Sequence, residues 1–297
     1  MFGRNKNLNK KILILGSTGL IGHQIYTYLN KNNEYILFNL SKSKLNEETI
    51  ICDVLNYKNL EKVILEIMPD FIINCIGILI QESELKPDIA IELNAKLPHK
   101  IKKTADKLNS RLIHLSTDCV FSGERGFYHE NDFKDGKTVY AKSKNQGEII
   151  SKNHLTIRTS IIGPELKLIG GELFDWFMRQ QGSIDGYTKS IWSGTTTYEL
   201  AKMIDFSIRN RISGLYNFSN LTSINKYDLL CLIKHYFDKD IVINKVDGLV
   251  TNKILIDNRK LVTFERLEYK KLIENMYINI KNSTGLYKQY EKYIKLK

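Results

Sequence analysis

The sequence predicts an α/β fold, a doubly wound parallel sheet, with a smaller lobe in the C-terminal part of the chain. Three observations lead to this prediction. Short apolar runs alternate with helix-like segments through the first half, the runs are apolar at successive positions, and the first run ends in a glycine-rich turn. Strands that are apolar on both faces are typical of parallel sheets that helices cover on both sides.

The elements of the first half follow one another regularly. The predicted strands are short and apolar: KILILG (11–16), YILFNL (35–40), FIINCIG (71–77), RLIHLSTDCVF (111–121) and LTIRTSIIG (155–163). The predicted helices lie between them: 20–32, 60–70, 88–109 and a segment that Tyr140 opens. This alternation predicts βαβ units and a single sheet over residues 1–163.

The pattern loosens after Pro164. Helices are predicted at 171–182, 197–210, 226–237 and, closing the chain, 274–296, with a strand at 214–220. No repeat, low-complexity linker or proline-rich hinge separates the two halves. We therefore expect residues 164–297 to form mainly a smaller lobe, with some segments returning to the domain of residues 1–163.

The composition is that of a soluble globular protein. The 297 residues are 42 % hydrophobic and 26 % charged, and no apolar run reaches the roughly 18 residues of a membrane helix. The polar, basic N-terminus has no signal-peptide pattern, so we expect a cytoplasmic protein with no membrane partner. The net charge of +11 comes from lysines scattered along the whole chain, which favours attraction of an anionic small molecule over binding of nucleic acid.

The four cysteines are isolated from one another along the chain: Cys52, Cys75, Cys119 and Cys231. They form no CxxC pair and no metal-ligand spacing, so we expect unpaired thiols in a reducing compartment and no metal site.

The glycine-rich turn reads GSTGLIG, with Gly16, Gly19 and Gly22 between the first strand and the helix that follows it. Glycines at such a turn let the backbone approach a pyrophosphate, which the free N–H groups at a helix N-terminus favour. A tight turn without a ligand is the alternative. The strand-turn-helix context favours a dinucleotide site of the Rossmann type.

The end of the second strand should meet the adenosine ribose of such a dinucleotide. A carboxylate there would bond both ribose hydroxyls and favour NAD. The chain instead reads FNLSKSK, with Asn39, Ser41 and Lys42. A basic, hydroxylic end suits a 2′-phosphate, so we predict NADP (NADPH) as the cofactor, with NAD and a ligand-free lysine-rich turn as the alternatives.

The strand at 111–121 delivers Ser116, Thr117 and Asp118 near its carboxyl end, the edge at which open α/β sheets bind their ligands. Tyr140 and Lys144 follow, one helical turn apart. A free tyrosine has a pKa near 10, which is too high for acid–base work at neutrality. An ammonium at about 4 Å, at an effective dielectric constant of about 20, attracts the phenolate by about 4 kcal/mol at most, or about three pKa units. The spacing therefore predicts a proton-delivery set.

Taken together, GSTGLIG, STDCVF and YAKSK resemble the signatures of the extended short-chain dehydrogenase/reductase family, namely GxxGxxG and YxxxK. Within it, STDCVFSG, YAKSKNQGE, RTSIIG and GLYNFSN are most similar to the dTDP-4-dehydrorhamnose reductase group. The resemblance implies NADPH-dependent reduction of the C4 carbonyl of a nucleotide-linked 4-keto-6-deoxysugar, which supplies an activated deoxysugar for surface polysaccharide synthesis. Thr117, Tyr140 and Lys144 match the catalytic triad of this group. Tyr140 would donate the proton, and Lys144 would also bind the nicotinamide ribose.

The same resemblance assigns further positions. Those expected to contact the cofactor are Thr18, Leu20 and Ile21 in the phosphate loop, Asp53 at the adenine, Cys75, Ile76 and Gly77 at the end of the strand predicted at 71–77, and Asn94 in LNAKLPH. Those expected near the substrate are Thr117, Asp118 and Arg158. Trp176, in the second lobe, is either a core residue or a platform for the nucleotide sugar.

Two departures from the group leave the substrate open. Ala141 follows the tyrosine where the group usually has glycine, and the second-lobe segment WSGTTTYEL lacks the usual proline. A dehydratase is disfavoured, because Cys119 stands where such enzymes have glutamate. A sugar-nucleotide epimerase on the same fold and a non-catalytic NADP-binding regulatory subunit remain alternatives. The lysine-rich C-terminal segment is expected to be a solvated helix face, and a homodimer contact there is left open.

Overall fold

The computed structural model describes residues 10–31, 34–168, 170–220, 222–257, 264–283 and 285–294. The chain divides into two compact units, each assembled from several stretches. The first unit comprises residues 1–120, 134–158 and 201–216, and the second comprises residues 121–133, 159–200 and 217–297. The basic segment at residues 1–9 lies outside the described residues.

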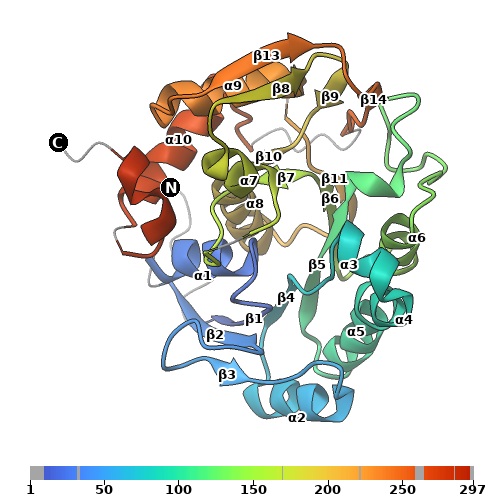
Figure 1. Ribbon diagram of the computed structural model, residues 1–297. Coiled ribbons are helices and arrows are strands. Elements are labelled where there is room, and N and C mark those ends of the chain that lie inside the picture. The colour runs from blue at the N-terminus through green and yellow to red at the C-terminus, as the bar shows by residue number, and fades with distance from the viewer. Residues whose placement is uncertain are drawn as a thin grey trace, which may run out of the picture. The chain divides into compact units, whose positions relative to one another are not determined.

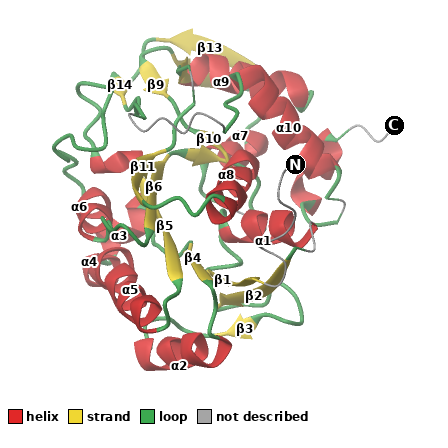
Figure 2. Ribbon diagram, turned by 180° about the vertical axis from the view of Figure 1, so that it is seen from behind, coloured by secondary structure: helices red, strands yellow, loops and turns green. Residues whose placement is uncertain are grey.

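The first unit is built on a seven-stranded sheet with the order β11-β6-β5-β4-β1-β2-β3. Its strands are β1 (Lys10–Leu15), β2 (Tyr35–Ser41), β3 (Ile50–Ile51), β4 (Phe71–Asn74), β5 (Arg111–Thr117), β6 (Leu155–Thr159) and β11 (Gly214–Asn217). β1 pairs in parallel with β2 and β4, β2 with β3, and β4 with β5. Figures 1 and 2 show β2, β1, β4 and β5 side by side. This is the doubly wound Rossmann order, so the predicted fold class is confirmed.

The sheet is buried on both faces, which explains its continuous apolar runs. Successive side chains of a strand point to opposite faces, yet Ile12, Leu13, Ile14 and Leu15 are all fully buried. The helices of this unit are α1 (Gly22–Lys31), α2 (Tyr57–Ile67), α3 (Ile80–Leu85), α4 (Pro87–Ala90), α5 (Leu97–Lys107) and α6 (Val139–Gln146). On one face, α2 and α5 contribute Leu60, Ile64 and Ile101 to the core that contains Leu13 and Leu15.

Two predicted strands end earlier than expected for a local reason, and one predicted helix is interrupted. The strand predicted at 71–77 ends at Asn74, whose side chain accepts the Ile76 N–H at 3.1 Å. The strand predicted at 111–121 ends at Thr117, whose hydroxyl accepts the Cys119 N–H at 3.1 Å. The helix predicted at 88–109 is interrupted by a π-helical turn, η1 (Ile91–Lys96). Polar side chains that bond the next turn of backbone end an element without changing its apolar pattern.

The second unit combines helices with three small sheets. Its helices are α7 (Leu173–Arg179), α9 (Lys226–Tyr236) and α10 (Tyr269–Lys281), with a 3₁₀ turn η3 (Lys288–Tyr293). β8 (Ser183–Tyr187) pairs in parallel with β13 (Val242–Val246), and both pack on α9 (Figure 1). β9 (Ser190–Trp192) pairs with β12 (Ile224–Asn225) and β14 (Thr251–Asn252), and β7 (Ile161–Ile162) pairs with β10 (Thr195–Thr196). α8 (Thr197–Arg209) begins in this unit and ends in the first.

Aromatic side chains form the core of the second unit. Phe174 packs against Phe237 and Tyr290 with ring centroids 5.1 Å apart in each pair. The helix predicted at 274–296 is in fact α10 followed by η3, and residues 284 and 295–296 of that segment lie outside the described ones. Within the described ranges, no helix is both long and apolar enough to cross a membrane.

Candidate active site

The glycine-rich turn closes tightly at the carboxyl end of β1. Gly16 has φ +79°, and its N–H donates to the Leu40 carbonyl on β2 at 2.8 Å. The Gly19 N–H donates a hydrogen bond to the Gly16 carbonyl at 3.0 Å. α1 begins at Gly22, where a Cβ atom would lie only 2.2 Å from the Gly16 carbonyl oxygen. The turn therefore requires glycine at both ends, and it leaves Thr18, Gly19, Leu20 and Ile21 at least partly exposed at the start of a helix.

The carboxyl end of β2 carries no carboxylate. Asn39 is buried and accepts a hydrogen bond from Ser17 Oγ at 3.1 Å. Beyond it, Lys42 Nζ lies 3.2 Å from Asp53 Oδ1, and both side chains are more than half exposed. The Leu55 N–H, and then Lys42, hold the pKa of Asp53 below its usual value. The structure thus brings together two residues that the sequence assigned to the adenosine half of the cofactor.

The carboxyl end of β4 lies beside the glycine turn. A Cβ atom on Gly16 would be 3.1 Å from Ile76 Cγ1 and 3.3 Å from the Cys75 carbonyl carbon. These two strands are neighbours at the point where the strand order reverses, and open α/β sheets bind dinucleotides at that point. A Cβ atom on Gly77 would be 3.9 Å from Lys144 Nζ. Gly77, one of the predicted cofactor residues, is therefore a neighbour of the predicted catalytic lysine.

Asn94 connects the end of β4 to the helix that carries Tyr140. Its side chain is fully buried and bonds the backbone of Ile78, while Nδ2 also donates to Ser143 Oγ at 3.2 Å. Ser143 Oγ in turn donates to the Tyr140 carbonyl at 3.0 Å. π-helical turns occur frequently at functional sites, and Asn94 lies in one.

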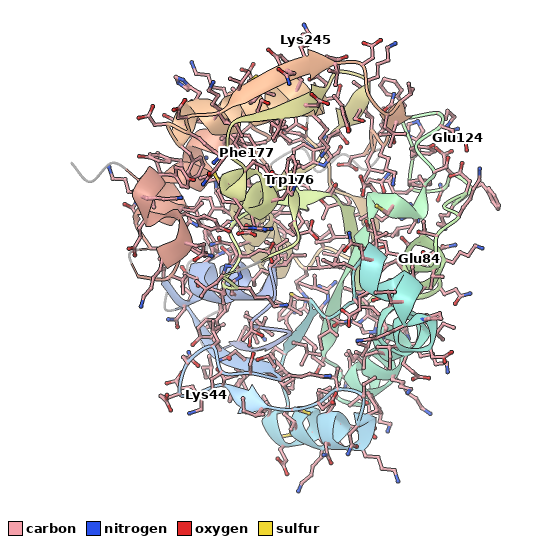
Figure 3. The ribbon with its side chains drawn as sticks, in the orientation of Figure 1. Lys44, Glu84, Glu124, Trp176, Phe177 and Lys245 are labelled. Atoms are coloured by element: carbon pink, nitrogen blue, oxygen red, sulfur yellow. The ribbon has the colours of Figure 1, made fainter. Side chains whose placement is uncertain are left out.

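The helix α6 begins with two caps. Thr138 Oγ1 accepts the Ala141 N–H at 3.0 Å, and the Glu84 carboxylate on α3 accepts the Val139 N–H at 2.8 Å. Figure 3 shows Glu84 beside the start of this helix. The caps fix where the helix starts, and Tyr140 and Lys144 follow one turn apart on it.

The three residues predicted to be catalytic come from adjacent elements of the first unit. Thr117 ends β5, and α6 packs against that strand. Lys144 Nζ donates to the Leu115 carbonyl of β5 at 2.6 Å. Thr117, Tyr140 and Lys144 are each less than a tenth exposed. Burial lowers the pKa of Lys144 to about 8, and Glu148 and then Cys75 oppose this fall. The site therefore holds an ammonium in an environment that favours its neutral form.

Two predicted substrate residues are buried and bonded to other side chains of the protein. Arg158 is fully buried, and its Nε and Nη2 donate to the two carboxylate oxygens of Glu148 at 2.6 and 2.7 Å. The contact of Arg158 with substrate stays a prediction. Asp118 is buried and accepts the Thr117 hydroxyl at 3.2 Å. Trp176 lies on α7 of the second unit and is 37 % exposed, whereas the adjacent Phe177 is fully buried (Figure 3).

Sequence reasoning did not find Glu148, Ser143 or Glu84 as parts of this site. Glu148 follows Gly147, just beyond the end of α6, and the sequence pattern assigned it no role. The available signal was the arginine in a strand otherwise made of buried residues, because a buried guanidinium requires a buried carboxylate.

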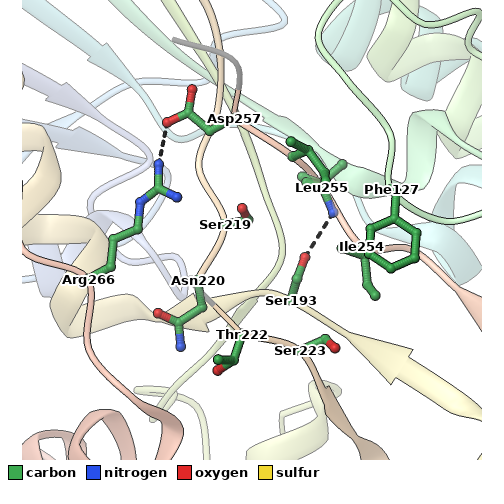
Figure 4. Close-up of a pocket in the computed structure, with 11 residues that line it drawn as sticks. Phe127, Ser193, Ser219, Asn220, Thr222, Ser223, Ile254, Leu255, Asp257 and Arg266 are labelled. Atoms are coloured by element: carbon green, nitrogen blue, oxygen red, sulfur yellow. Dashed lines mark hydrogen bonds and ion pairs between the residues drawn. The ribbon is translucent and has the colours of Figure 1, made fainter. Parts of the chain in front are cut away.

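The second unit contains a cavity of about 430 Å³ (Figure 4). Its wall is mainly polar and includes Ser193, Ser219, Asn220, Thr222, Ser223, Asp257 and Arg266. Arg266 is ion-paired with the buried Asp257, and Ser193 Oγ accepts the Leu255 N–H at 3.0 Å. None of the residues predicted from the sequence lines this cavity.

Comparisons with known proteins agree with this geometry. Residues 10–254 match the model of the RmlD substrate binding domain. Methionine adenosyltransferase 2 subunit beta of Bos taurus is 25 % identical over 251 residues, which cover 77 % of this chain and 73 % of that protein. The dTDP-4-dehydrorhamnose reductase of Aggregatibacter actinomycetemcomitans is 30 % identical over 156 residues, 50 % of this chain and 51 % of that protein.

Solved structures show the same fold. The dTDP-4-dehydrorhamnose reductase of Bacillus anthracis in complex with NADP superposes with a TM-score of 0.78 at 24 % identity, over 92 % of this chain and 100 % of that one. The UDP-glucose 4-epimerase of Thermotoga maritima with UDP-glucose gives a TM-score of 0.75 at 15 % identity, over 92 % of this chain and 99 % of that one.

Proposed function

The chain belongs to the RmlD substrate binding domain family, and on that premise we propose that it reduces the C4 carbonyl of a nucleotide-linked 4-keto-6-deoxysugar with NADPH. The family match confirms the membership that the sequence motifs predicted. One observation carries the proposal. A buried lysine ammonium lies one helical turn from Tyr140 and is bonded to the strand that ends in Thr117.

The proposed chemistry needs a hydride and a proton on opposite ends of one carbonyl group. NADPH, when bound, supplies the hydride to the carbon. Tyr140 donates its phenolic proton to the carbonyl oxygen, and the positive charge of Lys144 stabilises the phenolate that remains. The Thr117 hydroxyl holds the same carbonyl oxygen. The product is a nucleotide-linked deoxysugar with a hydroxyl group at C4, and we place it in the synthesis of surface polysaccharide.

The residues around the glycine turn fit the cofactor. The turn that requires glycine at Gly16 and Gly22 would hold the pyrophosphate at the N-terminus of α1. Lys42 and Ser41 would meet the 2′-phosphate, since β2 offers no carboxylate to compete with it. Asp53 would face the adenine, and Cys75, Ile76, Gly77 and Asn94 would line the nicotinamide half. The NADP complex of the Bacillus anthracis protein supports this choice, and NAD is the alternative.

A second candidate has an observation of its own. The relatives that cover about three quarters of this chain are named as subunits of methionine adenosyltransferase 2. A non-catalytic, NADP-binding subunit is therefore the main alternative, ahead of an epimerase. The complete set of Thr117, Tyr140 and Lys144 favours the enzyme, and the four unpaired cysteines suit a reducing cytoplasm.

The test is NADPH oxidation, followed at 340 nm, on addition of a dTDP- or UDP-linked 4-keto-6-deoxysugar. Tyr140→Phe removes the proton donor, and Lys142→Met, an exposed lysine on the same helix, is the matched control for Lys144→Met. We expect oxidation by the wild type and by Lys142→Met, and its loss in the other two variants. NADPH binding without oxidation of either sugar nucleotide would favour the non-catalytic subunit. Tightly retained NAD would favour the epimerase.

A further inference from the structure

Glu148, a buried carboxylate, follows the proposed catalytic lysine by four residues. The Glu148 side chain, just after α6, is only 3 % exposed. It accepts three hydrogen bonds, from Ser116 Oγ at 2.8 Å, Arg158 Nε at 2.6 Å and Arg158 Nη2 at 2.7 Å. A paired, two-point contact with a guanidinium holds a carboxylate in one orientation.

Glu148 and Lys144 form hydrogen bonds with consecutive residues of β5. Lys144 Nζ donates to the Leu115 carbonyl, and Glu148 accepts from the hydroxyl of the next residue, Ser116. Thr117 follows immediately at the end of the strand. A single short stretch of backbone therefore fixes the lysine, the carboxylate and the proposed substrate hydroxyl.

The charged and titratable neighbours come from each element packed around the pair. Those that face Glu148 are Arg158 from β6, Lys134 from the segment before α6, with Nζ at 3.9 Å, and Lys144. Those that face Lys144 are Glu148, Cys75 after β4 and His114 from β5. Burial raises the pKa of the Cys75 thiol to about 12, so this thiol is neutral at physiological pH. Burial, and then Lys144, lower the pKa of His114, so this imidazole is neutral as well.

We propose that Glu148 is a positioning residue for catalysis: its carboxylate, fixed by Arg158 and Ser116, keeps the Lys144 ammonium charged beside Tyr140. The inference rests on the proposed function for its catalytic consequence. Its electrostatic part rests on the bonds of the two side chains to consecutive residues of β5. Among the groups that face the lysine, Glu148 supplies the negative charge, because Cys75 and His114 are neutral.

The removal of the carboxylate should make the lysine titrate at lower pH. The substitution Glu148→Gln keeps the shape and removes the charge, but it leaves the Arg158 guanidinium buried without its partner, which is strongly destabilising. The double variant Glu148→Gln/Arg158→Gln removes both charges. It leaves no unpaired buried charge, so it tests the proposal even if the single variant does not fold. Glu84→Gln is the matched control, because Glu84 is a carboxylate that touches the opposite end of the same helix.

The direct measurement is an NMR titration of the Lys144 ε-methylene group in protein carrying ¹³C-lysine, with the signal assigned through Lys144→Arg. We expect the pKa of Lys144 to fall by about one unit in Glu148→Gln, by less in the double variant, and not at all in Glu84→Gln. In kinetics, the alkaline limb of the kcat profile should move down by the same amount in Glu148→Gln while KM changes little. A purely structural role would lower the rate at every pH without moving the limb.

An unchanged titration of Lys144 in a folded Glu148 variant, single or double, would overturn the proposal. An unmoved alkaline limb with a shifted titration would overturn its catalytic part. Failure of the wild type to oxidise NADPH would overturn the proposed function instead, and the titration would still decide whether Glu148 holds the charge.

Discussion

The side chain of Asn94 bonds both backbone polar groups of Ile78. Its Oδ1 accepts the Ile78 N–H at 3.0 Å, and its Nδ2 donates to the Ile78 carbonyl at 3.1 Å. The Asn94 amide thus makes the two backbone hydrogen bonds with Ile78 that a neighbouring strand would otherwise make. Because the same amide also reaches Ser143 on α6, it couples the proposed nicotinamide site to the helix that carries Tyr140.

Asn94→Ala should destabilise the protein by about 1–3 kcal/mol, because a buried N–H and a buried carbonyl lose their partner. NADPH affinity should fall as well, since Gly77 lies between Asn94 and Lys144. Urea unfolding and NADPH fluorescence titration measure the two effects. Asn210→Ala, which removes an exposed amide, should change the free energy of unfolding by less than about 0.5 kcal/mol. Equal effects of the two substitutions would contradict the structural role assigned to the buried amide of Asn94.

Gly22→Ala should weaken NADPH binding at least about tenfold, because the new methyl group collides with the Gly16 carbonyl and opens the turn. The control is Gly171→Ala, where a Cβ atom meets nothing within 4 Å. Fluorescence titration compares the two variants with the wild type. If Gly22→Ala bound NADPH as the wild type does, the glycine turn would not be the pyrophosphate site.

Lys42→Ala should lower the affinity for NADPH more than the affinity for NADH. Loss of a charged contact to the 2′-phosphate should weaken NADPH by about tenfold and leave NADH nearly unchanged. Lys44→Ala is the matched control, since Lys44 is a nearby exposed lysine that pairs with Glu47. Dissociation constants for both cofactors at one ionic strength make the comparison. A parallel loss for NADH and NADPH would place the 2′-phosphate elsewhere.

His23 should make folding stability sensitive to acid. Burial lowers its pKa to about 4, against the opposing hydrogen bond to the Gly19 carbonyl. The folded-state pKa lies below the unfolded value of 6.5, so the folded state disfavours the charged imidazole. The contribution of His23 to the free energy of unfolding is therefore fully present above pH 6.5 and is lost as the pH falls toward 4. Between pH 7 and pH 5 the wild type should lose about 2 kcal/mol through this group.

The variant His23→Asn keeps an N–H near the position of Nδ1, which lies 2.8 Å from the Gly19 carbonyl, and does not titrate. Urea unfolding at pH 7 and pH 5 should show a smaller difference for this variant than for the wild type. His235→Asn, at an exposed position on α9, should keep the wild-type difference. The explanation fails if His23→Asn is as acid-sensitive as the wild type.

The sheet was predictable because burial on both faces leaves a plain trace in the sequence. Runs such as Ile12–Leu15 are apolar at every position, and that pattern needs no knowledge of the neighbouring strands. β8 and β13 were missed for the opposite reason. They read SIDGY and VINKV and are largely exposed or only partly buried, so neither hydrophobicity nor alternation distinguishes them from loops.

The candidate site was predictable where one local segment carries the chemistry. The turn from Gly16 to Gly22 and the pair Tyr140 and Lys144 are each set by a single loop or helix. The pairing of Arg158 was not predictable, because its partner Glu148 lies beyond the end of a helix and on no shared periodic face. Contacts that join two elements at one point leave no repeating pattern, and only the folded chain reveals them.

The first unit is assembled from three separate stretches of chain, and this limits how the protein can be taken apart. A fragment that stops at residue 158 would keep β6 but lose β11, its neighbour in the sheet. The backbone groups of β6 that now pair with β11 would form an open edge, and an open edge is a template for aggregation. Deletion mapping would therefore report insolubility at almost every cut, whichever residues bind the ligands. Dissection of this molecule has to proceed by single substitutions in the intact chain.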